Sequence, residues 1–159
     1  MREVSLMHND FAELSSKILS QGGSFRFKAH GFSMYPIIRN EDVISVHPVE
    51  FSALHSGDVV LYYGDKKHLV AHRIVGKQLR NGRIFLRMRG DAAYSPDEWV
   101  RDEQVMGKVV SIQRGERFIH LNKNFQRLMS FCWIKLSPVS HLFFKIAYMV
   151  KRAAQRFLP

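Results

Sequence analysis

Residues 75–88 read VGKQLRNGRIFLRM, and this stretch decides the fold. At its centre stands Asn81-Gly82, a dipeptide that favours a type I′ turn because both residues tolerate a positive φ. After the turn, Ile84, Leu86 and Met88 recur at every second position, as in a strand with one face buried. The stretch therefore predicts a β-hairpin that joins residues 75–79 to residues 84–88.

The segments on both sides of this hairpin have the same period of two. In residues 24–29, for example, Phe25, Phe27 and Ala29 alternate with charged or polar side chains. Further strands are predicted at residues 24–29, 43–46, 59–63, 68–75 and 105–112. Many short strands joined by tight turns indicate a mainly β domain over residues 24–115, with a barrel-like sheet.

Helical patterns flank the predicted sheet. Residues 1–23 hold a short amphipathic helix from Asp10 to Ser20, and residues 116–159 form a tail with two apolar helical stripes. All charged residues after Glu116 are Lys or Arg, so the tail carries much of the net charge of +10. Basic amphipathic helices are typical of a membrane interface. Packing against the core is the alternative use of such stripes.

The same sequence gives little sign of other partners or compartments. Lys135, Pro138 and Lys145 interrupt the most apolar run, which argues against a transmembrane helix. The N-terminal residues lack the apolar region of a secretory signal. We therefore expect a cytoplasmic protein, or one attached peripherally to an anionic membrane through the tail. Nucleic acid is not an expected partner, although a basic tail can bind it.

Cysteine and histidine usage excludes several classes of site. Cys132 is the single cysteine, so the chain has no internal disulfide and no thiolate metal cluster. The histidines are scattered, without the spacing of a zinc site. We expect neither a metal nor a cofactor.

Three kinds of side chain at predicted strand edges suggest a serine hydrolase. Ser33 lies in the motif GFSMYP (residues 31–36), His72 lies on a strand, and Asp91 and Asp97 follow a later strand. A serine hydroxyl needs a neighbouring base to take its proton. An acid then orients the imidazole and stabilises its protonated form. Asp97 is the preferred acid because Asp91 follows Gly90 in a turn-like dipeptide and can instead fix that turn.

The residues leave other interpretations open. His72 on its own is also compatible with an ordinary strand histidine. Lys66 or Lys67 could act as the base of a Ser/Lys pair if buried and neutral. The oxyanion of the reaction would be bound by backbone N–H groups around Ser33, since Gly31 supplies no hydroxyl.

The order of these motifs resembles the superfamily of signal peptidase I and LexA-like serine peptidases (S24/S26). The resemblance covers about residues 24–112 and rests on five blocks in the family's order. The blocks are GFSMYP (31–36), GDVV (57–60), HRIV (72–75), GD (90–91) and GKV (107–109). It implies the family's β fold, with Ser33 as nucleophile. A histidine in the base position resembles the Ser-His-Asp type, in which a second aspartate follows the Gly-Asp block, as Asp97 does here.

The resemblance also implies the reaction. It favours an endopeptidase that cleaves signal or leader peptides after small residues, without a metal. An extended substrate would bind as an added strand beside Ser33. The main alternative is an inactive peptide- or membrane-binding module with the same fold. A nucleic-acid-binding regulator is a weaker third hypothesis, because no helix-turn-helix precedes residue 24.

Overall fold

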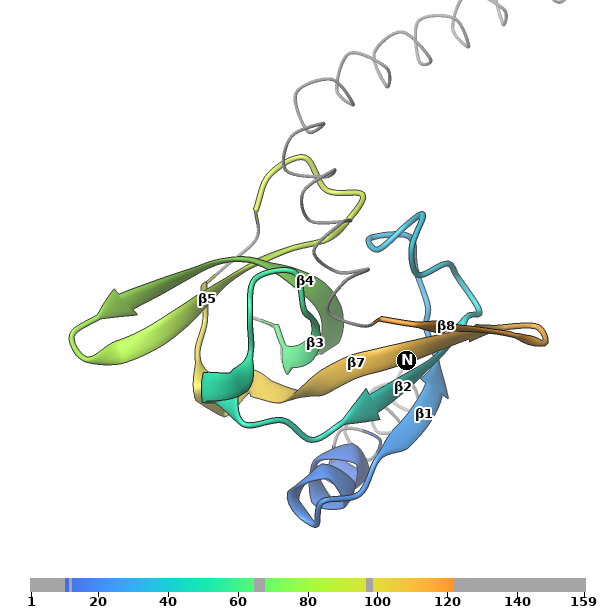
Figure 1. Ribbon diagram of the computed structural model, residues 1–159, viewed down its shortest axis with the longest axis horizontal. Helices are drawn as coiled ribbons and strands as arrows, with labels where there is room; N and C mark the ends of the chain where they lie inside the picture. The colour runs from blue at the N-terminus through green and yellow to red at the C-terminus, as the bar shows by residue number, and fades with distance from the viewer. Residues whose placement is uncertain (1–10, 12, 65–67, 97–98, 122–159) are drawn as a thin grey trace, which may run out of the picture.

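The computed structural model describes residues 11, 13–64, 68–96 and 99–121. Within these residues the protein is mainly β: an antiparallel sheet curls into a half-barrel, with one short helix at its N-terminal end (Figure 1). The predicted helices of the basic tail lie outside the described residues. No helix in the described part of the chain is long and apolar enough to cross a membrane.

The strands follow one another in space in the order β1-β2-β7-β3-β4-β5-β6, and β8 pairs with β7. Their bounds are β1 Phe25–Lys28, β2 Val43–His47, β3 Val59–Tyr63, β4 Leu69–Arg80, β5 Arg83–Arg89, β6 Trp99–Val100, β7 Val105–Arg114 and β8 Arg117–His120. Two short 3₁₀ helices, Phe51–Ala53 and Asp102–Gln104, lie in the connections before β3 and β7. All neighbouring strands pair antiparallel.

The N-terminal helix ends at Ser20, as its apolar pattern predicts. Gly22 then adopts a φ of 78°, and the N–H of Gly23 donates to the Ile18 carbonyl at 2.9 Å. This left-handed residue and backbone bond are typical of a helix C-terminus.

The Asn81-Gly82 turn forms as predicted. Both residues have positive φ, 50° and 75°, and they join β4 to β5. The segments predicted as residues 68–75 and 75–79 are one continuous strand of 12 residues, β4. Its pairing with β5 shifts register between Ile74 and Gly76, which marks an irregularity in the middle of the long strand.

Two clusters of buried side chains form the core, on different parts of the curled sheet. The first contains Leu19 of the N-terminal helix and joins β2, β3 and β7 to residues of the β1–β2 loop. The second lies between β3, β4, β5 and β6 and includes Tyr62, Ile74 and Leu86. The apolar stripe of the helix and the alternating apolar residues of the strands therefore form the core, as their periods in the sequence predict.

The sheet extends further than predicted. Residues 117–120 were assigned to the helical tail, but they form β8, and the sheet runs to His120 rather than to residue 115. Gly115, with a φ of 58°, turns the chain so that Arg114 pairs with Arg117. The two-residue strand β6 was not predicted either. Strands this short are fixed by their partners, β7 and β5, more than by their own pattern.

Candidate active site

Ser33 lies on the loop of residues 31–40 that joins β1 to β2. Met34 and Ile38 point into the first core cluster, and they fasten the loop to the sheet. Ser33 itself is exposed, and its neighbours Phe32 and Tyr35 are 70% and 51% exposed. The loop therefore presents a hydroxyl between two exposed aromatic rings, where a polypeptide could reach it.

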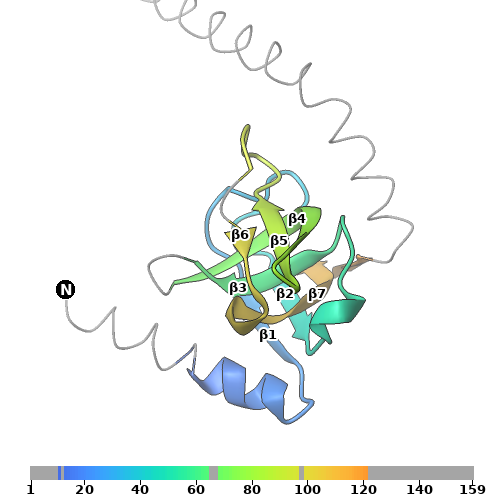
Figure 2. The ribbon, with the colours of Figure 1, turned by 90° about the vertical axis from the view of Figure 1, so that its left-hand side faces the viewer.

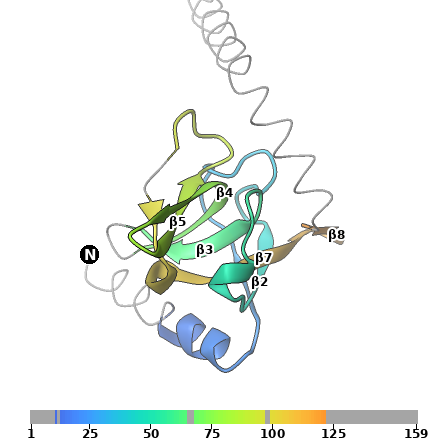
Figure 3. The ribbon, with the colours of Figure 1, turned by 60° about the vertical axis from the view of Figure 1, so that its left-hand side comes forward.

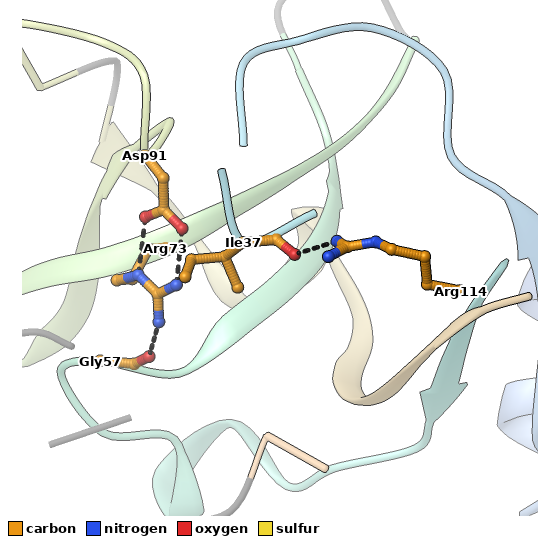
Figure 4. Close-up of polar contacts among 5 residues, drawn as sticks. All are labelled: Ile37, Gly57, Arg73, Asp91 and Arg114. Carbon is orange, nitrogen blue, oxygen red and sulfur yellow. Dashed lines mark hydrogen bonds and ion pairs between the residues drawn. The ribbon is translucent and has the colours of Figure 1, made fainter. Parts of the chain in front are cut away.

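A partly buried ion pair fixes the base of this loop. Asp42 is 3% exposed and accepts two hydrogen bonds from Arg114 of β7, at 2.9 and 2.7 Å. The same guanidinium donates to the Ile37 carbonyl at 3.0 Å (Figure 4). The backbone N–H of Arg39 also donates to Asp42, at 2.7 Å. The loop that carries Ser33 is thus tied to a central strand by charge-assisted hydrogen bonds.

His72 projects from β4 on the face that contacts the second core cluster. Its strand partner is Val60 of β3, and the hydroxyl of the buried Tyr62 lies 3.3 Å from its Nδ1 atom. Val60 and Tyr62 share a face because side chains alternate along a strand. Tyr62 therefore meets His72 diagonally across the two strands.

Gly90 shows how close Ser33 and His72 lie. A Cβ atom built on this glycine would be 3.2 Å from His72 Nε2 and 3.3 Å from Ser33 Cβ. The Nε2 atom and the Ser33 Cβ can therefore be separated by no more than about twice that distance. Nε2 is the ring nitrogen on the Gly90 side, where Ser33 also lies, while Nδ1 lies near the Tyr62 hydroxyl. A general base needs this orientation to receive a hydroxyl proton.

The loop after β5 contacts the serine loop directly. The N–H of Ala92 donates to the Ser33 carbonyl at 2.8 Å. Both loops stand side by side on the same side of the sheet in all three ribbon views (Figures 1, 2 and 3). The candidate site is thus assembled from the β1–β2 loop, strand β4 and the β5–β6 loop.

Asp91 forms a buried ion pair with Arg73. Its two carboxylate oxygens accept hydrogen bonds from Arg73 at 2.7 and 2.6 Å, and both side chains are almost fully buried. Arg73 also donates to the Gly57 carbonyl at 2.7 Å (Figure 4). This bidentate pair ties the start of the β5–β6 loop to β4 and to the turn before β3. It holds Gly90 in place beside His72.

The other predicted members of the site lie outside the described residues. Asp97 is among them, and so are the alternative bases Lys66 and Lys67. In the described part of the chain, no group of three or more His, Cys, Asp or Glu side chains is placed to hold a metal ion.

Two backbone N–H groups near the serine already have acceptors. The N–H of Gly31 donates to Asn40 at 3.0 Å, and that of Tyr35 donates to the Phe32 carbonyl at 3.1 Å. An oxyanion at Ser33 would therefore need N–H groups from other residues of the loop.

Tyr62 and Arg73 were not expected at the site from the sequence, and Gly90 was expected only as part of the Gly-Asp block and its turn. Tyr62 resembled any apolar strand residue, and its hydroxyl acquires a role only through the β3–β4 register. Arg73 follows His72 directly and so projects to the opposite face of β4. The sequence offered one signal for the Arg73–Asp91 pair. An arginine follows His72 directly, and an aspartate follows Gly90 directly.

Comparison of the chain with protein-family models and with curated proteins gave no match. A relation to peptidases therefore stays a prediction, based on the motif blocks and on the positions of Ser33 and His72 beside Gly90.

Proposed function

We propose that this chain is a serine endopeptidase of the signal peptidase type, with Ser33 as nucleophile and His72 as general base. The observation that carries the proposal is that His72 Nε2 and Ser33 Cβ lie 3.2 and 3.3 Å from the position that a Cβ would take on Gly90. The motif order supports the same assignment. An extended signal or leader peptide, cleaved after a small residue, is the proposed substrate.

The proposed reaction uses both ring nitrogens of His72. His72 Nε2 takes the proton as Ser33 Oγ attacks the peptide carbonyl, and it then gives this proton to the leaving amine. An acyl-enzyme remains on Ser33. A water molecule, deprotonated by the same nitrogen, attacks the ester and releases the new carboxylate, and Nε2 returns the proton to Ser33 Oγ. Nδ1 has to stay protonated throughout, so the groups that face Nδ1 select the tautomer.

Asp97 is the proposed orienting acid, and Asp91 is proposed to be structural. The engagement of both Asp91 oxygens with Arg73 supports this choice, because the aspartate already neutralises a buried guanidinium. Tyr62 is a positioning residue in this scheme, since its hydroxyl lies at Nδ1. We place the enzyme in the cytoplasm or at an anionic membrane surface, held there by its basic tail.

Covalent labelling tests the proposal without knowledge of the substrate. The full chain is incubated with a fluorophosphonate probe, and the modified residue is identified by peptide mass mapping. We expect one label on Ser33, no label in Ser33→Ala, and a labelling rate in His72→Ala lowered by roughly 10²–10⁴.

Exposed residues of the same types supply matched controls. Ser95→Ala and His68→Ala change an exposed serine and an exposed histidine near the site and should label as the wild type does. Circular dichroism establishes that each variant is folded. A folded wild type that takes no label, or takes it elsewhere than on Ser33, would favour the inactive binding module instead.

A further inference from the structure

The β4–β5 hairpin carries positive charge far from Ser33. Residues 77–87, its outer part, contain four Lys or Arg residues and no Asp or Glu. The hairpin extends to one side of the molecule, beyond the strands next to it (Figure 1). Lys77, Arg80 and Arg83 near its tip are exposed.

The two faces of the hairpin tip differ in character. Leu79 pairs with Ile84, and these side chains share one face. They are 69% and 38% exposed, so an aliphatic pair is presented to the outside. Arg80 pairs with Arg83 on the opposite face. Lys77 lies two residues before Leu79 and therefore shares its face. The tip is amphipathic, with guanidinium groups on one face and the aliphatic pair beside Lys77 on the other.

Aromatic rings hold the arginines of the cationic face. The guanidinium of Arg80 lies 4.6 Å from the ring centre of Trp99 and 5.6 Å from that of Phe85. Arg87 lies over Trp99 at 5.0 Å. Arg80 also donates two hydrogen bonds to Gln78. Stacked guanidinium groups are partly ordered in advance, and their planar fork suits phosphate oxygens.

We propose that this hairpin is an anionic-lipid binding surface, distinct from the basic tail. Its Leu79–Ile84 face would enter the boundary between headgroups and acyl chains, while its cations contact lipid phosphates. A strongly basic polar face opposite exposed aliphatic side chains is the pattern by which interfacial segments bind anionic membranes. Each Lys or Arg close to such a surface strengthens binding about fivefold.

The alternative anionic partner, nucleic acid, fits this surface less well. Bases of single strands bind by stacking on exposed aromatic rings. Here Trp99 and Phe85 are already covered by arginines, and an aliphatic pair offers no stacking platform. The aliphatic side chains find a matching partner only in lipid.

Vesicle co-sedimentation of the full chain tests the proposal. Vesicles of phosphatidylcholine alone are compared with vesicles that contain one quarter phosphatidylserine, at fixed salt. We expect Lys77→Gln/Arg83→Gln and Leu79→Ser/Ile84→Ser each to weaken binding to the anionic vesicles on the order of tenfold. Lys28→Gln/Arg117→Gln removes the same charge from β1 and β8 and should have a much smaller effect.

An environment-sensitive probe locates the contact. The fluorophore NBD is attached to Leu79→Cys in a Cys132→Ser background, and its emission should shift to the blue only with anionic vesicles. Unchanged binding by both hairpin variants would assign membrane attachment to other parts of the chain and overturn the proposal. So would hairpin variants that lose affinity for a DNA or RNA oligonucleotide but not for vesicles.

Discussion

Among single residues, Gly90 stands where an added side chain would meet both Ser33 and His72. A Cβ there would lie 2.7 Å from the Ser33 carbonyl oxygen as well as close to Ser33 Cβ and His72 Nε2. Contacts this short force neighbouring atoms apart, and in this place the neighbours are the proposed nucleophile and base. A substitution should therefore affect the reaction more than the fold.

We predict that Gly90→Ala lowers the fluorophosphonate labelling rate at least a hundredfold while destabilising the protein by about 1–3 kcal/mol. Labelling kinetics and urea unfolding measure the two effects. Gly76→Ala is the matched control, because its Cβ would meet only Arg87, at an ordinary 3.6 Å. A Gly90→Ala protein that labels at the wild-type rate would contradict the proposed proximity.

Substitutions of the two candidate acids, Asp91 and Asp97, should differ in their effects on stability and on labelling. Asp91→Asn leaves the buried Arg73 without its counter-charge, and breaking such a pair costs about 3–5 kcal/mol. The folded fraction should still label within about tenfold of the wild type. Asp97→Asn should keep wild-type stability and lose labelling by a factor of about 10⁴, as expected when an orienting acid is removed. Urea unfolding and the labelling rate per folded molecule are measured for both variants. Loss of labelling in Asp91→Asn but not in Asp97→Asn would make Asp91 the acid.

The site was only partly predictable from residue types. Ser33 and His72 could be proposed as nucleophile and base because their motifs are local in sequence. The Tyr62 contact at Nδ1 depends on the β3–β4 register and on a diagonal between strands, neither of which a single segment encodes. The Arg73–Asp91 pair likewise needs residues from two separate elements to meet.

At the scale of elements, the Asp42–Arg114 pair connects the serine loop to β7. Burial of Asp42 disfavours its charged form and by itself raises its pKa. The hydrogen bond from Arg114, helped by the Arg39 N–H and by the nearby positive charges, outweighs this and leaves the pKa of Asp42 lowered. A lowered folded-state pKa stabilises the protein above the unfolded value of about 3.9. This stabilisation is lost as the pH falls through the folded pKa.

Asp42→Asn should therefore destabilise the protein by about 2 kcal/mol at neutral pH, because Arg114 loses a charge-assisted partner. The difference from the wild type should stay constant between pH 5 and 8 and shrink below about pH 4. Urea unfolding across this pH range measures it. Glu41→Gln, at an exposed neighbouring pair with Lys28, should change stability by less than about 0.5 kcal/mol. A pH-independent Asp42→Asn effect would contradict the electrostatic explanation.

Elements with a strong pattern of their own could be predicted, and those that depend on partners could not. Alternation and the Asn81-Gly82 turn identified β1 to β5 and β7. β6 has two residues, too few to show any period. β8 follows a tight turn at Gly115, and in the sequence its residues could not be distinguished from the helical pattern that follows them. Pairing with β7 decides their conformation.

The whole molecule brings the site together through the curl of its sheet. In the strand order, β2 and β4 are separated by β7 and β3, which would place them roughly 14 Å apart in a flat sheet. The loop before β2 nevertheless reaches the face of β4 beside His72. Curvature, together with the buried Met34 and Ile38, carries the loop across that gap. The sequence predicted a barrel-like sheet, but which strands adjoin could be learned only from the structure.

The continuous strand β4 connects the proposed cleavage site to the proposed lipid-binding surface. His72 lies toward one end and Leu79 near the other, so the rigid strand sets a spacing of at most about 23 Å between the base and the proposed lipid contact. A hairpin resting on a bilayer would hold the cleavage site at a set height above the lipid. The protein would then act as a ruler, able to cut only precursors whose cleavable bond stands that far from the membrane surface.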